Sequence, residues 1–572
     1  MNILPRVAKA DQRSKVEQAK EVSRFLRGAI ADGLADPGLA QFGEDDANLL
    51  KIHGVYQQYD RDSATERKHK GKERSFQFMT RLRIPGGRLS ASQYLACDDF
   101  ADRFGNGTLR ITTRQTFQYH GILKGELKGL LASIHGAALT TFATCGDVVR
   151  NVVAPSSPYH GPVYETMQDL ARTFSTRFLP QTNAYAEIWV DGEAVVGEEV
   201  EPLYGATYLP RKFKIALATP DDNSTDALTN DLAVIALFDG DHFLGANLAV
   251  GGGLGLTHNK SKTYARLAVP LLFVEPEAIG DAIEAVIKVQ RDYGDRSDRK
   301  HARLKYLVTE KGLDWIKAEV ERYAERSYEA PRPMTRFRVP DLYGWHAQGN
   351  GSWFLGTPIP SGRIADRGSQ KLRTALRTLV ERHQPTVILT ATQDILFSGL
   401  NIADRDVIEA LLREHGVALA QDLAPIQRGA ISCPALPTCG LALTEAERVR
   451  HEILDEILER LKAHGLEQEP LSLRITGCPN GCARPYVGDI GLVGRMPGHY
   501  ALYLGGNAEG TRLSSCVLDK LARRDISQAL EPIFYDFARR RQGIESFGDY
   551  CSRLGSRYLA ELISDYLSPV MI

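Results

Sequence analysis

The sequence predicts an α+β fold made of two matching halves that face each other, with a ligand held between them. Residues 108–122 resemble residues 386–400, and the Ile-Pro-Gly-Gly-Arg segment at 84–88 is echoed by Ile-Pro-Ser-Gly-Arg at 359–363. The two pairs are separated by nearly the same number of residues, which indicates one duplicated module. Within each copy, the pattern predicts a strand, a Pro/Gly turn, a helix and a second strand.

A second echo follows each module and predicts a second pair of matching domains. Residues 231–236 resemble 489–494, and residues 243–252 resemble 500–506. In both copies, alternating apolar residues run into glycines, a pattern typical of strands that end in turns. Ligands commonly lie in clefts between domains, so we expect the ligand between the two halves.

Length and composition exclude several classes of protein. At 572 residues the chain is too long for a single core, and its net charge of −1 implies no bulk attraction to nucleic acid. The first ten residues lack the apolar stretch of a signal peptide. Apolar runs such as 269–274 are too short to span a bilayer. We therefore expect a cytoplasmic enzyme that binds neither nucleic acid nor a membrane.

Four cysteines near the end of the chain are its strongest chemical signal. Cys433 and Cys439 enclose Pro-Ala-Leu-Pro-Thr, and Cys478 and Cys482 enclose Pro-Asn-Gly. Thiolates select iron–sulfur clusters, zinc or copper(I), and the first spacing is wide for structural zinc. We expect a cluster held by four cysteines. A zinc site and four buried thiols without a metal are the alternatives. The other four cysteines are scattered, which is typical of a reducing compartment.

The first half lacks such cysteine pairs and carries basic residues on its expected strands instead. If each of these basic residues is considered alone, an ordinary surface charge explains it. Together, beside apolar neighbours, they need an anionic partner, because an unpaired buried cation is costly. We expect a polycarboxylate cofactor, an oxyanion substrate, or both. The basic residues are Arg81, Arg83, Arg110, Arg114, Arg150, Lys212 and Lys214.

These features together resemble the sirohaem/[4Fe–4S] sulfite and nitrite reductases. The resemblance rests on the two cysteine pairs, on Thr-Thr-Arg-Gln-Thr at 112–116 and on Lys212-Phe-Lys214. Residues 51–61, 208–214 and 262–266 are similar to segments of the sulfite branch. The likeness runs in order from about residue 20 to residue 570, and it is strongest to the haemoprotein (beta) subunits of assimilatory NADPH–sulfite reductases.

The resemblance implies a division of the chain into parts. Ferredoxin-like half-modules are expected at 75–145 and 345–420. A first α/β domain on the cationic cofactor and substrate side would cover 146–344, and a second one that carries the cluster would cover 421–572. The N-terminal extension, 1–74, has apolar residues at helical spacing, including Val16, Ala19 and Val22. It is a candidate for docking an electron donor, or a helix packed on its own domain.

The resemblance also implies roles for individual residues. Cys433, Cys439, Cys478 and Cys482 would hold the cluster, and Cys482 would also join it to the sirohaem iron. Residues that match cofactor-contacting positions are Arg110, Thr112, Arg114, His120, Lys305, Gln393 and Asn480, with Arg303 as the alternative to Lys305. Residues that match positions around the substrate are Arg83, Arg150, Lys212 and Lys214; the spacing to Pro85 favours Arg83 over Arg81. Thr113 departs from the family pattern, which has Asn there.

The implied reaction is the six-electron reduction of sulfite to sulfide, in sulfate assimilation and cysteine biosynthesis. In this scheme Arg83 and Arg150 clamp the oxyanion, and Lys212 and Lys214 deliver protons. Nitrite reduction to ammonia on the same cofactors is the nearest alternative, and a non-catalytic electron-transfer or binding protein is the second.

Electrons must come from another protein, because no dinucleotide-binding motif is recognisable. The glycine-rich segment 251–255 has the wrong spacing for G-x-G-x-x-G. A flavoprotein reductase that draws on NADPH is the first expectation for the donor, and ferredoxin is the second.

Overall fold

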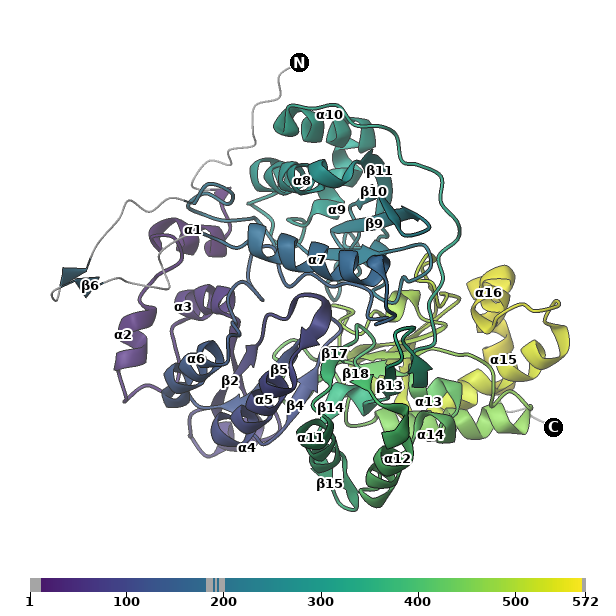
Figure 1. The fold of residues 1–572 in the computed structure, drawn as a ribbon. Coiled ribbons are helices and arrows are strands. Elements are labelled where there is room, and N and C mark those ends of the chain that lie inside the picture. Colours follow the sequence, from purple (N-terminus) through teal and green to yellow (C-terminus); the bar gives the residue numbers. More distant parts are fainter. Residues whose placement is uncertain (1–11, 182–188, 191–192, 195–200, 568–572) are drawn as a thin grey trace.

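The computed structural model describes residues 12–181, 189–190, 193–194 and 201–567 (Figure 1). The first ten residues, where no signal peptide is expected, lie outside this range. In Figure 1 the first half of the chain runs from purple to teal, and the second half, green to yellow, lies beside it.

The two half-modules have the same order of elements. The first contains β1 (Val55–Tyr59), β2 (Phe76–Arg81), β3 (Arg88–Leu89), α5 (Ala91–Phe104), β4 (Leu109–Ile111), β5 (Phe117–Ile122) and α6 (Leu127–Gly136). The second contains β12 (Gly344–Ala347), β13 (Trp353–Thr357), β14 (Arg363–Ile364), α11 (Leu372–His383), β17 (Thr386–Leu389), β18 (Ile395–Leu400) and α12 (Arg405–Glu414). A short hairpin, β15 (Asp366–Arg367) and β16 (Gln370–Lys371), precedes α11. The expected α+β class and its duplication are confirmed.

Each half-module lends a strand to the other. The first sheet has the order β1-β2-β5-β4-β14, and the second has β12-β13-β18-β17-β3. The turns before the exchanged strands carry Gly87 and Gly362, both with positive φ (78° and 67°). A Cβ at Gly87 would stand 2.2 Å from the Leu389 carbonyl oxygen, and one at Gly362 would stand 2.3 Å from that of Ile111. Only glycine fits both the conformation and the close approach, so the echoed Pro/Gly segments are the crossing points of the two modules.

The second pair of domains also repeats. The first sheet, in the order β11-β10-β9-β8, consists of β8 (Ile215–Ala218), β9 (Leu232–Asp239), β10 (His242–Val250) and β11 (Val269–Val274). The second sheet consists, in order, of β19 (Ile431–Ser432), β20 (Leu473–Thr476), β21 (Ile490–Met496), β22 (His499–Leu504) and β23 (Ser515–Ala522). The pairs β8–β9, β19–β20 and β20–β21 are parallel, and the others are antiparallel. A parallel bridge from Val149 to Phe213 extends the first sheet at the place of β19.

Helices cover these sheets. The first domain has α7 (Pro162–Arg177), α8 (Ile279–Tyr293), α9 (Leu304–Lys311) and α10 (Leu313–Ala324), and the second has α13 (Pro425–Gly429), α14 (Arg450–Ala463), α15 (Ile526–Arg540) and α16 (Phe547–Leu567). A small ribbon joins β6 (Trp189–Val190) to β7 (Glu193–Ala194). One buried apolar cluster joins the first domain to both half-modules, and another fills the second domain.

The N-terminal extension folds onto the first half. It contains α1 (Lys15–Val22), α2 (Ile30–Ala35), α3 (Glu44–Leu49) and α4 (Ala64–His69). Because β1 pairs with β2, the boundary expected after residue 74 falls between two paired strands. In the ranges that the structure describes, no helix is both long and apolar enough to cross a membrane.

Candidate functional site

The two cysteine loops start at neighbouring parallel strands. Cys433 directly follows β19, and Cys478 follows β20, with Ser432 in register with Ile475. Because the carboxyl ends of parallel strands share one edge, both loops begin at the same place. The backbone N–H of Gly477 donates to Sγ of Cys433 at 3.3 Å, an interaction that favours a thiolate.

The four thiols lie in one electrostatic neighbourhood. Burial raises the pKa of Cys433, Cys439 and Cys478, and nearby Cys482 raises each of them further. Thiols that oppose one another's ionisation in this way suit a shared cation that can compensate several negative charges.

Four thiols on two loops that begin at one sheet edge are the donor set that iron–sulfur clusters use. Among the described residues, no three His, Cys, Asp or Glu side chains are grouped as they would be around one metal ion. The chemistry of the donor set fits a four-iron cluster.

Cationic side chains of the first half gather opposite the cysteine loops. Lys212 and Lys214 lie on either side of buried Phe213, just before β8, and the parallel bridge to Val149 brings Arg150 beside them. Burial lowers the pKa of both lysines well below the usual value, and nearby cations lower it further: chiefly Arg211 and Arg150 for Lys212, and Arg114 and Arg303 for Lys214. We call Arg81, Arg114, Arg150, Arg211, Lys212, Lys214 and Arg303 the cation cluster.

Most of this cation cluster lacks acidic partners. Within the described ranges, Arg303 alone of the seven forms an ion pair, through two bonds to Asp231 at 3.0 and 2.6 Å. Nε of Arg81 and Nε of Arg114 are buried without a hydrogen-bond partner in the described part of the chain. Burying cations without anions is costly. The cation cluster therefore fits a polycarboxylate such as sirohaem together with a small oxyanion.

Arg83 does not belong to the cation cluster, contrary to the expected substrate clamp. Its guanidinium donates to Ser175 Oγ at 2.8 Å, the Ser175 carbonyl at 2.8 Å and the Ala143 carbonyl at 3.0 Å. Strand β2 ends at Arg81, and the Arg83 backbone then pairs with Thr140, so the two arginines do not share one strand face. Arg81 instead donates to Sγ of Cys145 at 3.4 Å and helps to lower the pKa of Arg114.

Lys305 is likewise set back from the cation cluster. Its ammonium donates to the carbonyl oxygens of Gly253 and Gly255, both at 3.0 Å, and to that of Tyr264. It therefore orders a glycine loop, whereas Arg303 acts electrostatically on Lys212 and Lys214. Because the guanidinium of Arg303 is held by Asp231 and the ammonium of Lys305 by carbonyl oxygens, both residues stay candidates for a cofactor carboxylate.

Other expected cofactor residues lie where the half-modules meet the second domain. Arg110 donates to Glu447 Oε2 at 3.2 Å and to the Ser432 carbonyl at 2.7 Å. Gln393 Oε1 accepts from Ser432 N at 3.1 Å. His120 is buried with neither ring nitrogen hydrogen-bonded to any described residue. Burial and the nearby Arg363 and Arg110 lower its pKa well below the usual value. An unpartnered buried imidazole indicates room for a further polar group.

The glycine loop and the Thr112–Thr116 turn contact the second cysteine loop directly. Leu256 N donates to the Pro479 carbonyl at 2.9 Å, and a Cβ at Gly255 would lie 3.6 Å from Oδ1 of Asn480. Within the turn, Thr112 Oγ1 accepts from Arg114 N at 3.2 Å. Thr113, the departure from the family pattern, donates to the Cys482 carbonyl at 3.1 Å. The two halves therefore meet at the expected site.

Tyr56, Cys145 and Arg211 were not assigned a role from the sequence. Burial works to lower the pKa of Arg150, but Tyr56 and Cys145 outweigh it and raise this pKa. Tyr56 lies in segment 51–61, whose likeness to the sulfite branch was the available signal. Cys145 gave no such signal: it is one of the four scattered cysteines interpreted as core or surface thiols, since nothing in its spacing pairs it with another residue.

Two family models match the chain. One, described as the nitrite/sulfite reductase ferredoxin-like half domain, matches residues 69–137 and 346–415. The other, the nitrite and sulphite reductase 4Fe-4S domain, matches residues 171–328. The chain is 45% identical to the NADPH sulfite reductase hemoprotein beta-component of Myxococcus xanthus, over 95% of this chain and 96% of that one. The chain belongs to the nitrite and sulfite reductase family.

Another relative in this family has a different electron donor in its name. The ferredoxin sulfite reductase of Synechococcus elongatus is 45% identical over 97% of this chain and 91% of that one. The structure of the Mycobacterium tuberculosis NirA protein covers 96% of this chain and 97% of that chain, with a TM-score of 0.77 and 23% identity, which supports the fold.

The 4Fe-4S domain match falls on the first α/β domain, whose matched residues contain no cysteine. The four cysteines of the two loops lie in the second α/β domain, outside the residues that this family model matches.

Proposed function

We propose that this chain is a sulfite reductase, which adds six electrons to sulfite and yields sulfide and three waters. The observation that carries the proposal is the cation cluster facing the four-cysteine site across one interface. Thr113 touches the Cys482 backbone there, and the charge of Lys212 acts on Cys478. Binding of an oxyanion and delivery of electrons are thereby brought to one place.

The residues divide by the group that each would hold. Cys433, Cys439, Cys478 and Cys482 would hold a four-iron cluster. Those that would receive the carboxylates or ring edges of a sirohaem are Arg110, Thr112, Arg114, His120, Gln393, Asn480 and either Lys305 or Arg303. When bound, the coupled sirohaem and cluster supply single electrons to the sulfur atom.

Arg81 and Arg150 would hold the oxygens of sulfite. A guanidinium offers two parallel donors to an oxyanion, and its charge offsets the charge that develops as S–O bonds break. We place Arg81 here in place of Arg83, because the guanidinium of Arg83 is occupied by Ser175 and Ala143.

Lys212 and Lys214 would deliver protons to the departing oxygens. Each oxygen leaves as water after taking two protons and two electrons. Burial and neighbouring cations lower the pKa of both ammonium groups. A lowered pKa makes a lysine a better acid near neutral pH, and a bound dianion restores part of the charge balance.

The experiment that tests this function is steady-state reduction with a chemical electron donor, with sulfite and nitrite in competition. The proposal requires that sulfite be converted to sulfide and be preferred over nitrite at equal concentration. Preference for nitrite would favour reduction of nitrite to ammonia on the same cofactors.

We propose a flavoprotein reductase that draws on NADPH as the electron donor, with ferredoxin as the alternative. The beta-component names of several relatives support the first, and the name of the Synechococcus protein supports the second. Mixing the purified chain with each reduced donor and following sulfide release separates them. All eight cysteines lie in the described part and are free, which supports a cytoplasmic location.

A further inference from the structure

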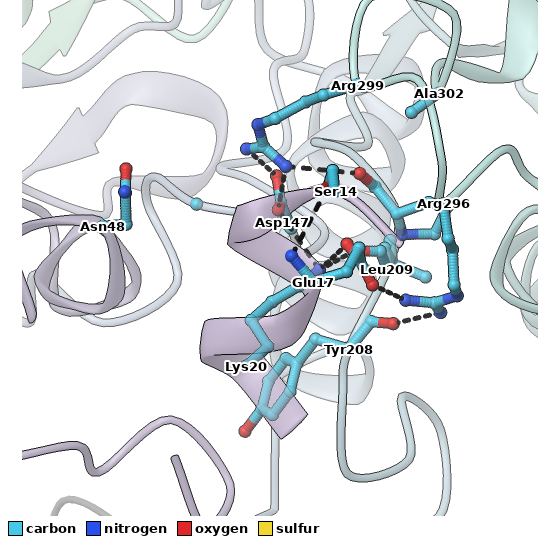
Figure 2. Close-up of polar contacts among 12 residues, drawn as sticks. Ser14, Glu17, Lys20, Asn48, Asp147, Tyr208, Leu209, Arg296, Arg299 and Ala302 are labelled. Carbon is cyan, nitrogen blue, oxygen red and sulfur yellow. Dashed lines mark hydrogen bonds and ion pairs between the residues drawn. The ribbon is translucent and has the colours of Figure 1, made fainter. Parts of the chain in front are cut away.

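Helix α1 buries charged residues against the first domain. Glu17 and Lys20 are 1% and 3% exposed, whereas Val22, on the expected apolar stripe, is 82% exposed. Figure 2 shows Glu17 and Lys20 with Asp147, Arg296 and Arg299, and we call these five residues the α1 ion network. Burying charged side chains costs free energy unless each is paired with an opposite charge. The partners of Glu17 and Lys20 therefore indicate the structural role of α1.

The partners of the α1 ion network lie on the two segments that carry the anion-binding cations. Asp147 stands three residues before Arg150. Arg299 donates to both of its carboxylate oxygens, at 2.7 and 2.9 Å, and Lys20 lies 3.4 Å from Oδ2. Burial works to raise the pKa of Asp147, but Arg299 and Lys20 outweigh it and hold this pKa far below its usual value. The carboxylate is therefore a fixed anchor.

The second segment is held through its backbone. Lys20 donates to the Leu209 carbonyl at 2.9 Å, and Arg296, which pairs with Glu17, donates to the Tyr208 carbonyl at 2.6 Å. Arg299 donates to the Pro210 carbonyl at 3.4 Å. These three carbonyls immediately precede the stretch 211–214, which contains Arg211, Lys212 and Lys214.

The two held segments are bonded to each other. Leu209 N donates to the Asp147 carbonyl at 3.1 Å, Phe213 N to that of Val148 at 3.0 Å, and Arg150 N to that of Phe213 at 2.9 Å. A shift of the Asp147 end would therefore move Arg150 and both lysines together.

We propose that Glu17 and Lys20 are positioning residues for oxyanion binding: α1 fixes the relative placement of Arg150, Lys212 and Lys214 through the α1 ion network. The inference rests on the proposed function, because it assigns the N-terminal extension to the sulfite site. Side chains that bind an oxyanion through several donors need placement to a fraction of an ångström. A helix from outside the sheet supplies it here.

The test compares Lys20→Met with Lys15→Met, whose side chain is on the exposed face of the same helix. Both variants lose one lysine charge from α1. We expect Lys20→Met to raise KM for sulfite about threefold to tenfold, a factor typical of mutations within a network of contacts. The value of kcat should change less than about twofold. Lys15→Met should match the wild type, and Lys20→Arg should recover most of the affinity. Sirohaem content, read from the visible spectrum, should be equal in all of them.

A second readout does not depend on turnover. Amide hydrogen exchange should be faster in Lys20→Met over 145–151 and 209–214, and unchanged over β21 and β22. Wild-type exchange in both segments, or an unchanged KM, would overturn the proposal. If Lys20→Met does not fold, Glu17→Gln is judged by the same two readouts against Glu21→Gln, which is exposed. A wild-type protein that leaves sulfite unreduced would overturn the proposed function instead, and the exchange result would still decide the positioning role.

Discussion

The hydroxyl of Thr113 donates to the carbonyl oxygen of Cys482 at 3.1 Å, so the basic first half touches the last cysteine of the second half. In the first half, the residue two positions after Thr113 is Gln115, which has a positive φ. Its counterpart in the second half, Gln393, also has a positive φ. The duplicated scaffold thus brings its two chemically different copies together at one turn.

Replacing Thr113 by Val should loosen this contact. The variant keeps the side-chain shape and removes one neutral hydrogen bond, which contributes about 1 kcal/mol. We expect Tm to fall by about one degree and the visible absorption of the cluster to bleach faster in air. Thr113→Ser, which keeps the hydroxyl, is the control. Equal behaviour of the Val and Ser variants would show that the bond has no consequence.

Arg81→Ala and Arg83→Ala should fail in different ways. Removing Arg81 takes a cation from the oxyanion site, so KM for sulfite should rise about tenfold or more while Tm stays near the wild-type value. Removing Arg83 leaves the Ser175 and Ala143 acceptors without their donor. That loss should cost about 2–3 kcal/mol of unfolding free energy. Sulfite titration and thermal melting of both variants check the assignment, and the opposite pattern would return the clamp to Arg83.

Lys214→Met should leave sirohaem and cluster in place and reduce turnover. A positioned acid contributes about 10²–10⁴-fold in rate, of which Lys212 can supply part. We therefore expect a decrease of about tenfold or more in kcat with normal iron content. Full turnover in both the Lys212→Met and Lys214→Met variants would contradict proton delivery by these lysines.

Glu447 should make the chain sensitive to acid. Burial works to raise its pKa, but Arg363 and Arg110 outweigh it and lower this pKa from 4.5 to about 2. A carboxyl with a lowered folded-state pKa stabilises the protein above its unfolded pKa and loses that contribution as pH falls from 4.5 towards 2. The loss is on the order of 3 kcal/mol. In Glu447→Gln, stability should be lower at neutral pH and should fall less steeply in this window. Denaturant unfolding at several pH values measures it.

Short repeated segments predicted the duplication because each repeat is required by the same structural constraint in both modules. Ile-Pro-Gly-Gly-Arg and Ile-Pro-Ser-Gly-Arg mark the turns where Gly87 and Gly362 pass close to the opposite module. The exchange of β3 and β14 between the sheets was not predictable, since strands of two residues carry no periodic pattern. The cysteine loops were predictable because ligand type and spacing are local properties.

Residues whose direction depends on distant partners were not predictable. Alternation placed Arg81 and Arg83 on one face, but β2 ends at Arg81, and pairing with Thr140 turns Arg83 away. Helical periodicity favoured Val22, whereas ion pairs from Asp147 and Arg296 select Lys20 and Glu17 for the buried face. Such charge pairing across the chain leaves no signal in a local window.

Cys439→Ser should remove most of the iron while the chain still folds. Oxygen is a poor ligand for iron–sulfur clusters, and metal binding is coupled to stability. Iron content and Tm should both fall, whereas Cys516→Ser, at an exposed cysteine outside the loops, should change neither. Normal iron content in Cys439→Ser would place the cluster elsewhere.

The most direct test of the central claim is the amount of sulfide that the purified chain releases per reduced methyl viologen consumed, with sulfite as the only acceptor. If the cation cluster and the four cysteines form one site for complete reduction, six viologen electrons should disappear for each sulfide formed, without free intermediates. Viologen oxidation without sulfide, or none at all in protein that carries sirohaem and cluster, would contradict the account.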